Sequence, residues 1–388
     1  MQWINFLHLY QPANIESEKI VAATKHSYER IVRALEDHPE IKFTLNIAGC
    51  LLLRWDEEFH YNELILRIKK LIERGQIELV GSAAYHALLP LVKLAEAREQ
   101  IVENEKILKK YFGDNLKLRG FFFPEMAYGH KVGKLVKKLG YQWAIVDEIS
   151  LNGKLGNLDP EKRYVDTNSG LELVFRQRDI SETYVPETLA KALKENKLAT
   201  AITASDAELY GLHYIDHTAE FEKLLKTSGL IALTVSEFLE IKKEILKINA
   251  VEASWQSSEQ ELIDKQPYIL WHDQKNDVHN KLWKLVALAE KINKENSDNS
   301  NIVWAHWHLV RGMASCMFWW ASGRDFSPVF GPIAWNPDEI EKGINELIRS
   351  IRTLESSTDL VIKIKAEKLA MDIRKMIWHR HWSDYRKQ

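Results

Sequence analysis

Short apolar runs alternate with longer amphipathic segments through about residue 250, and this alternation constrains the fold more than any other feature of the chain. Segments such as 62–74 and 94–111 have the charged and apolar spacing of helices that cover a core on one side. Strand followed by helix, repeated along the chain, predicts an α/β fold with a parallel sheet or barrel. The apolar runs, each of strand length, span residues 3–9, 42–47, 77–82, 118–125, 143–147, 171–176, 199–204 and 231–235.

The pattern changes after Ala250. VEASWQSSEQELIDKQPY is expected to form a long loop, and from about Asp277 onward the chain has helical periodicity. NIVWAHWHLVRGMASCMFWWAS is apolar nearly all round, which predicts a central helix. We therefore expect an α/β barrel-type domain over residues 1–250 and a helical domain over residues 251–388.

Composition sets limits on function. The 388 residues are 45% hydrophobic and 28% charged with a net charge of −2, so no general attraction to nucleic acid or acidic membranes is expected. No apolar run approaches the roughly 20 residues of a membrane span, and no signal peptide is visible. Cys50 and Cys316 make no disulfide framework, which favours a reducing, cytoplasmic location. The 13 tryptophans suit either an aromatic core or a sugar-stacking surface.

Two acids follow predicted strands. Glu125 ends the run GFFFPE, and Asp206 lies in TASDAELYG with Glu208 two residues later. Each acid could be a helix cap or a surface charge. Alternatively, two carboxylates meeting at the carboxyl ends of strands are what cleavage of a glycosidic bond requires, one ionised and one holding a proton.

Other polar residues also follow strands. His8, Tyr10 and Gln11 end the first apolar run, and His86 follows the third. A histidine at a strand end is commonly a hydrogen-bonded structural residue, and both interpretations stay open here. In FWWASGRDF, Trp319, Trp320 and Asp325 form either core aromatics with a surface charge or a stacking wall with an acid that binds hydroxyls.

Metal ligands are present only in fragments. His213 and His217 have the i, i+4 spacing of helical zinc sites, and His306 and His308 flank a tryptophan. No glutamate directly follows the first histidine, and no third ligand is evident. We therefore expect neither a metal nor another cofactor.

Taken together, five stretches resemble glycoside hydrolase family 57, whose members are retaining enzymes that act on α-glucans. In chain order the stretches are HLYQP, QIELVGSAAYHALLPL, GFFFPE, SDAELYG and FWWASGRDF. The resemblance implies a distorted (β/α)7 barrel followed by a helical bundle that closes over the active-site cleft. It implies Glu125 as nucleophile and Asp206 as general acid/base. The positions that it implies for substrate binding are His8, Tyr10, Gln11, His86, Phe123, Glu208, His213, Trp319, Trp320 and Asp325.

Two residues depart from the family pattern. Tyr10 stands where the opening motif has its second histidine, and tyrosine does not become cationic near neutral pH. Phe123 precedes the Pro-Glu pair and GFFFPE contains no tryptophan, so stacking is retained but an N–H donor is lost. Both departures bear on substrate preference and leave both catalytic carboxylates in place.

The expected function is hydrolysis or transglycosylation of α-1,4-linked gluco-oligosaccharides through a covalent glycosyl-enzyme. The choice between water and a sugar as acceptor stays open, as does the oligomeric state. Two alternatives are a metal-dependent polysaccharide deacetylase on a similar barrel and a glucan-binding protein without catalysis.

Overall fold

The structure is a computed structural model. It describes residues 1–324, 334–355 and 360–385, together with the backbone of residues 326–327 and 331–332. The chain forms two compact units. The first comprises Met1–Ala84 and Leu89–Ile263, and the second comprises Tyr85–Leu88 and Asp264–Gln388. Residues 251–263 thus group with the first unit. The expected closure of the helical region over the site stays a prediction.

The first unit contains one fully parallel sheet in which β1 is central. His8 of β1 lies opposite Asn46 of β2 on one side and opposite Asp206 of β8 on the other. Polar residues at the ends of three neighbouring strands are therefore brought to one edge. The strands are β1 (Gln2–Leu9), β2 (Phe43–Ile47), β3 (Ile77–Leu79), β8 (Thr200–Asp206) and β9 (Ile231–Leu233), in the order β3-β2-β1-β8 with β9 also pairing with β1.

A second sheet of the same unit is mixed. Its strands β6 and β7 pair antiparallel, whereas the other neighbours pair in parallel. The sheet carries Glu125 just beyond its edge strand β4. In order, its strands are β10 (Ile245–Ile248), β6 (Arg163–Asp166), β7 (Glu172–Arg176), β5 (Trp143–Asp147) and β4 (Gly120–Phe122).

Two backbone junctions connect the sheets. The N–H of Phe122 donates to the carbonyl of Gly81 at 2.8 Å, which places β4 beside the continuation of β3. A Cβ on Gly81 would lie 2.0 Å from the Tyr141 hydroxyl, so this close approach requires glycine. The N–H of Gln177 donates to the carbonyl of Ile202 at 2.9 Å and brings the end of β7 to β8. Strands β1, β2, β3, β4, β5, β7 and β8 thus follow one another in a barrel-like arrangement.

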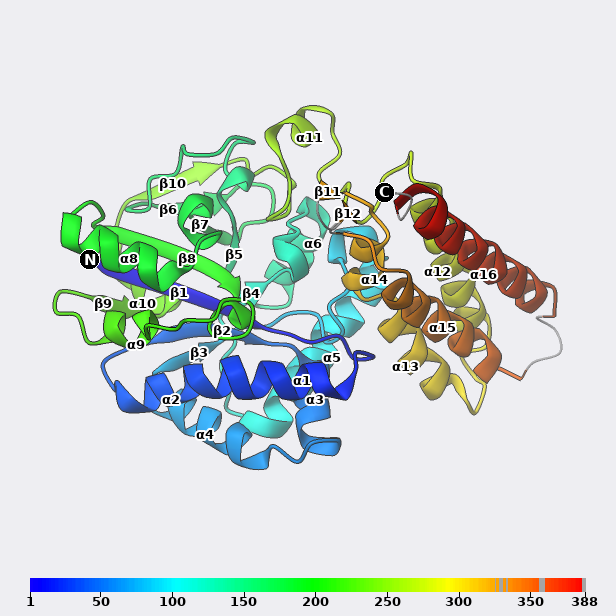
Figure 1. Cartoon of the computed structure of the whole chain (residues 1–388), viewed down its shortest axis with the longest axis horizontal. Coiled ribbons are helices and arrows are strands. Elements are labelled where there is room, and N and C mark those ends of the chain that lie inside the picture. Colours follow the sequence, from blue (N-terminus) through cyan, green and yellow to red (C-terminus); the bar gives the residue numbers. More distant parts are fainter. Residues whose placement is uncertain (325, 328–330, 333, 356–359, 386–388) are drawn as a thin grey trace. The chain divides into compact units, whose positions relative to one another are not determined.

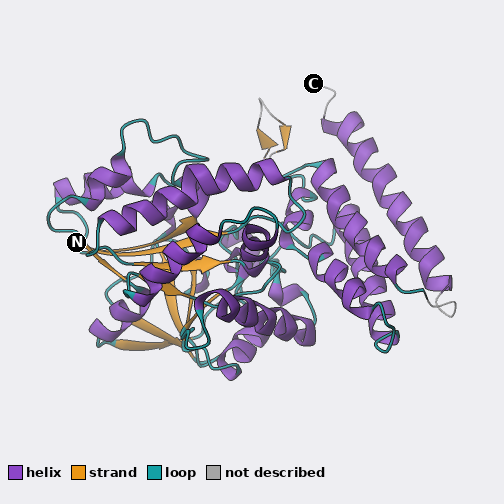
Figure 2. Ribbon diagram, turned by 90° about the horizontal axis from the view of Figure 1, so that it is seen from below, coloured by secondary structure: helices purple, strands orange, loops and turns teal. Residues whose placement is uncertain are grey.

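Amphipathic helices surround these strands (Figure 1). In α4, for example, Leu64, Ile68 and Leu71 recur at helical spacing and are buried, while the charged residues face outward. Figure 2 shows helices on more than one side of the strands. The helices of this unit are α1 (Ser17–Ala23), α2 (Glu29–Asp37), α3 (Gly49–Glu57), α4 (Asn62–Glu73), α5 (Leu94–Phe112), α6 (His130–Lys138), α7 (Arg178–Ser181), α8 (Val185–Glu195), α9 (Glu220–Leu225), α10 (Val235–Ile241) and α11 (Glu259–Ile263).

The second unit is helical, as expected for the C-terminal region. Helix α15 is its centre, because it packs against each of α12, α13, α14 and α16. Asn336 caps α15, its side chain accepting from the N–H groups of Asp338 and Glu339. The helices are α12 (Asp277–Glu295), α13 (Ile302–Gly312), α14 (Ser315–Trp320), α15 (Pro337–Thr353) and α16 (Leu360–Arg380), with a short antiparallel pair of β11 (Phe326–Ser327) and β12 (Gly331–Pro332).

The expectation of one central helix over residues 301–322 was wrong. The segment forms α13 and α14, which are separated at Met313 and Ala314. Only one side of α13 is buried, and Val303 and Trp304 are 72% and 60% exposed. Apolar composition alone therefore did not identify the buried helix. Across the described residues, every helix is either too short or too polar to cross a membrane.

Candidate active site

Glu125 occupies a strained turn directly after β4. Its backbone has φ 60° and ψ 19°, and Met126 follows with φ 47°. Left-handed conformations cost side-chain-bearing residues on the order of 1–3 kcal/mol each and persist where the surrounding structure enforces them. Pro124 contributes to this turn by fixing its own φ. The chain therefore holds the Glu125 carboxylate at the strand tip at an energetic cost.

The segment expected to be a long loop holds this turn in place. Ala253 and Tyr128 form an antiparallel bridge, and their N–H groups and carbonyls exchange hydrogen bonds of 2.8 and 3.2 Å. The N–H of Trp255 donates to the Glu125 carbonyl at 3.2 Å, and its indole Nε1 donates to Glu125 Oε2 at 3.0 Å. Part of the predicted loop is thus an added strand-like partner for residues 125–128.

Asp206 is the last residue of β8 and lies opposite His8 across the sheet. Its backbone is ordinary extended chain, with φ −64° and ψ 135°. Burial raises the pKa of the Asp206 carboxyl to about 6, and the positive charge of Arg176 opposes that shift. The carboxyl group therefore retains its proton to a higher pH than an exposed aspartate does.

Glu208 lies beside Asp206 in a hydrogen-bonded pocket. Gln11 Nε2 donates to Glu208 Oε1 at 2.6 Å, and the Tyr28 hydroxyl donates to the same oxygen. Burial raises the pKa of Glu208 to about 8, with a further contribution from the negative charge of Asp206. Two adjacent acids that are poorly solvated cannot both ionise easily, so this pair tends to hold a proton.

A π-helix at Thr24–Tyr28 fixes the loop that carries Glu208. The Ser27 hydroxyl donates to the carbonyl of Ala207, next to Glu208 in sequence. The carbonyl of His26 lies so near Gly211 that a Cβ there would be 2.2 Å away, and Gly211 has φ 132°. π-helical turns are rare and frequent at functional sites. Here the π-helix contacts the segment after β8 at both Ala207 and Gly211.

His8 is buried between aromatic rings. Its Nδ1 lies 2.7 Å from Asn46 Oδ1, and burial lowers the pKa of the ring to about 3, so His8 is neutral. The ring centroid is 4.6 Å from that of Phe122 and 6.4 Å from that of Trp255. The ring of Tyr10 stacks on that of His8, with centroids 5.5 Å apart. The tyrosine that departs from the expected motif is therefore part of this aromatic group.

Arg176 connects the two acid-bearing segments. Its Nη1 donates to the Ala204 carbonyl of β8 at 2.9 Å, and its guanidinium lies 5.3 Å from the centroid of the Trp255 ring. The buried Asp147 accepts from Arg176 Nε at 2.7 Å and from Arg178 Nη2 at 2.6 Å. Asp147 thus compensates the positive charge of Arg176, and the guanidinium of Arg176 lies beside the ring of Trp255.

Comparison with known proteins identifies the family. The model of glycosyl hydrolase family 57 matches residues 7–251, which is more than half of the chain. The chain belongs to glycosyl hydrolase family 57. Curated relatives of this family member include alpha-amylase 1 of Dictyoglomus thermophilum, 26% identical over 216 residues, and the 4-alpha-glucanotransferase of Thermococcus kodakarensis, 28% identical over 153 residues.

The chain covers only part of these relatives. The matches span 53% and 38% of this chain but 31% and 22% of the two relatives. Among solved structures, the family 57 branching enzyme of Pyrococcus horikoshii has a TM-score of 0.68 at 15% identity, covering 97% of this chain and 95% of that one. At this identity the likeness establishes the fold, and it confirms the predicted α/β barrel-like fold with a C-terminal helical region.

The first unit of this family 57 chain brings together half of the twelve site residues predicted from the sequence. It contains both predicted catalytic carboxylates and the polar residues that end β1. These residues are linked through register pairs, hydrogen bonds and ring contacts: Glu125, Asp206, His8, Tyr10, Gln11 and Glu208.

Phe123 lies in the core rather than beside the site. Its fully buried ring packs against Phe121 and Tyr128, with centroids 4.9 and 5.6 Å away. Phe122 instead faces His8 and Trp255. Successive strand residues point to opposite faces, so moving by one residue exchanges the core ring and the site ring. The expected stacking role of Phe123 is therefore not available in this structure.

His86 belongs to the second unit. It has φ 59°, and its Nδ1 lies 2.9 Å from the hydroxyl of Ser315. Trp319 and Trp320 lie in α14 of the same unit, where they are partly buried with ring centroids 4.5 Å apart. Asp325 lies outside the described residues.

The two histidine fragments are arranged differently from a helical zinc site. Residues 211–219 form no helix, so His213 and His217 lack the expected helical spacing. The His308 Nδ1 lies 2.6 Å from Oε2 of the buried Glu346, an interaction between α13 and α15. Among the described residues of either unit taken alone, no three His, Cys, Asp or Glu side chains bring ligand atoms within 4.8 Å of one another.

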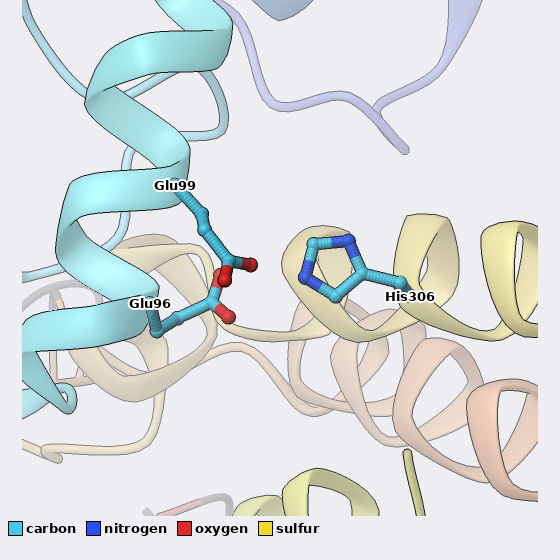
Figure 3. A group of neighbouring side chains, drawn as sticks. All are labelled: Glu96, Glu99 and His306. Carbon is cyan, nitrogen blue, oxygen red and sulfur yellow. The ribbon is translucent and has the colours of Figure 1, made fainter. Parts of the chain in front are cut away.

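Helix α5 presents a pair of acids. Glu96 and Glu99 lie one turn apart with their carboxyl groups on the same side of the helix (Figure 3). Gln100 Nε2 donates to Glu96 Oε1 at 3.3 Å. Two carboxylates one helical turn apart do not by themselves define a site.

Sequence reasoning missed the residues that hold the acids. Trp255 was placed in a loop, and Arg176, Asp147 and Tyr28 were not singled out. Their partners lie far away in sequence: 130 residues separate Trp255 from Glu125, and 180 separate Tyr28 from Glu208. No local periodicity encodes such pairs. The sequence offered one signal. Arg176 ends the apolar run 171–176, and residues at the ends of parallel strands meet at one edge of the sheet.

Proposed function

We propose that this chain is a retaining glycosidase or transglycosidase acting on α-glucans, with Glu125 as nucleophile and Asp206 as general acid/base. Its family 57 relatives include an alpha-amylase and a 4-alpha-glucanotransferase, which favours α-1,4-linked glucose chains as substrate. Neutral gluco-oligosaccharides would contact the aromatic and hydrogen-bonding groups around His8.

One observation carries the proposal: Glu125 and Asp206 come from separate strand tips and border the same aromatic group. Trp255 donates to Glu125 and lies against His8, and His8 lies opposite Asp206 in the sheet. The environments of the two acids differ, because Glu125 accepts an indole N–H whereas burial raises the pKa of Asp206 to about 6. A pair of carboxyl groups in unlike environments can divide into nucleophile and proton donor.

In the first step, a carboxylate oxygen of Glu125 attacks the anomeric carbon and forms a covalent glycosyl ester. The bond between that carbon and the glycosidic oxygen breaks, and the Asp206 proton passes to the departing oxygen. Glu208, Gln11 and Tyr28 border the leaving-group side as hydrogen-bonding partners. The buried environment raises the protonated fraction of Asp206 in the mildly acid range.

In the second step, Asp206 acts as base. It takes a proton from the acceptor hydroxyl, whose oxygen bonds to the anomeric carbon while the ester bond to Glu125 breaks. Two inversions give net retention. Water as acceptor makes the reaction hydrolysis, and a sugar hydroxyl makes it glucan transfer.

The test is incubation with single malto-oligosaccharides, with products resolved by size and the anomeric form of the new reducing end followed by NMR. We expect α-configured products. Products longer than the substrate identify transfer, and only shorter ones identify hydrolysis. β-configured initial products would contradict the double displacement, and binding without any product would contradict catalysis altogether.

A further inference from the structure

We propose that Trp255 is a positioning residue that orients the carboxylate of Glu125 for attack. The inference rests on the proposed nucleophilic role of Glu125 and adds a residue to that site. No motif pointed to Trp255, because its contacts with Glu125 exist only in the folded chain.

Trp255 contacts Glu125 at both its backbone and its side chain. Its main-chain N–H donates to the Glu125 carbonyl at 3.2 Å, and its indole Nε1 donates to Glu125 Oε2 at 3.0 Å. The first bond fixes the turn, and the second fixes the rotation of the carboxylate plane. A hydrogen bond to an ionised carboxylate is stronger than one between neutral groups. With Oε2 held by the indole, the direction of the second oxygen is set as well.

The indole is itself held firmly. Trp255 is 8% exposed, and its ring lies against Phe122 and His8, with centroids 6.1 and 6.4 Å away. The guanidinium of Arg176 lies 5.3 Å from the ring centroid, and its Nη2 is 3.4 Å from the Trp255 carbonyl. A donor whose own rotation is restricted transmits that restriction to the group it binds.

The strained turn at Glu125 is a reason why its carboxylate requires the contact with Trp255. The Glu125 carboxylate is carried by a left-handed residue beyond the strand end, and Met126 is left-handed as well. Residues 253–255 support this turn by pairing with residues 125–128. Productive attack requires alignment to within a fraction of an ångström, so loosening this support would affect reaction more than binding.

A purely structural role for Trp255 makes a different prediction, and the chain offers a matched control. Trp143 belongs to the same apolar cluster, is likewise buried and donates its indole N–H to the Ser236 hydroxyl at 3.1 Å. Trp255→Phe and Trp143→Phe remove the same atoms from one cluster. We expect similar losses in thermal unfolding midpoint for both variants.

The decisive readouts are turnover and covalent trapping. We expect Trp255→Phe to lower kcat on a malto-oligosaccharide by roughly 10–100-fold with KM changed less than about threefold. Labelling of Glu125 by a 5-fluoro-α-glucosyl fluoride, followed by mass spectrometry, should slow by the same factor. Trp143→Phe should leave both rates within about twofold of wild type. Equal rates for the two variants would overturn the inference.

The labelling experiment distinguishes failure of the proposed function from failure of this inference. If the reagent labels wild-type protein at a residue other than Glu125, the proposed function fails, whereas normal labelling of Glu125 in Trp255→Phe defeats only this inference. If Trp255→Phe does not fold, ¹⁵N-tryptophan NMR of wild type and Glu125→Gln replaces it. We expect one indole signal to move upfield in Glu125→Gln as the carboxylate acceptor is lost, and no such movement would overturn the inference.

Discussion

The surroundings of Glu125 and of Asp206 differ in how each acid is held. Glu125 lies on a left-handed turn and accepts a hydrogen bond from Trp255, whereas Asp206 lies on ordinary extended backbone. Asp206 is instead followed by Glu208, to which Gln11 and Tyr28 donate hydrogen bonds, and the low solvation of the two acids raises the pKa of both. The first environment favours orientation of a charge, and the second favours retention of a proton.

This difference fits the roles that we propose for the two acids. A nucleophile must be ionised and correctly directed, and a general acid must still carry its proton when the leaving oxygen needs it. Variants in the two regions should therefore fail in different ways.

The largest effect is expected for Glu125→Gln. The amide retains an oxygen for the Trp255 N–H but cannot attack the anomeric carbon. We expect turnover of malto-oligosaccharides to fall by roughly 10³–10⁶-fold, with a thermal unfolding midpoint close to that of wild type. Activity near the wild-type rate would remove Glu125 from the mechanism.

Asp206→Asn should distinguish the role of general acid from that of nucleophile. We expect a loss of roughly 10²–10⁴-fold on malto-oligosaccharides, because the leaving oxygen is no longer protonated. Fluoride leaves without protonation, so the formation of glycosyl-enzyme from α-glucosyl fluoride should be nearly normal in a rapid-mixing experiment. Glu125→Gln should fail with both donors. An equal defect of Asp206→Asn with both donors would argue against its role as acid.

Asp147→Asn tests how much the ion pairs of Asp147 with Arg176 and Arg178 stabilise the fold. The buried Asp147 compensates both Arg176 and Arg178, so its loss leaves uncompensated charge, and we expect about 3–5 kcal/mol of destabilisation in chemical unfolding. Glu182→Gln is the matched control, because Glu182 contacts the same arginines at 3.6 and 4.0 Å but its side chain is 54% exposed. Its cost should stay below about 1 kcal/mol. Equal costs for the two variants would contradict the role given to Asp147.

The smallest of the expected changes is in the stability of Glu208→Gln, and it should appear as a pH dependence of unfolding. Burial raises the pKa of Glu208 from 4.5 to about 8, so ionisation disfavours the folded state, and stability falls as pH rises through this range. Glutamine cannot ionise. The variant should match wild type near pH 4.5 and exceed it above pH 8 by on the order of 1 kcal/mol or more. The exposed Glu240→Gln should show no such trend, and a constant difference across pH would contradict the assignment.

Particular residues show how much of the fold and of the site could be predicted from the sequence. Glu125 and Asp206 were found because each follows an apolar run, and parallel strands deliver such residues to one edge. The resemblance predicts a stacking role for Phe123, whereas the ring of Phe122 faces His8 and Trp255, because a motif gives position but not face. The single helix expected over residues 301–322 became two, with Trp304 exposed, because composition does not say which side another helix covers.

The sequence by itself determined the α/β fold, the helical C-terminal region, the family and the two acids at strand tips. These follow from periodicity and motif order, which are local along the chain. Only the tertiary structure decided that Trp255 donates to Glu125, that Tyr28 and Gln11 hold Glu208, and that Arg176 lies against the indole ring. Hydrogen bonding and burial depend on distances between residues far apart in sequence, and folding alone sets those distances.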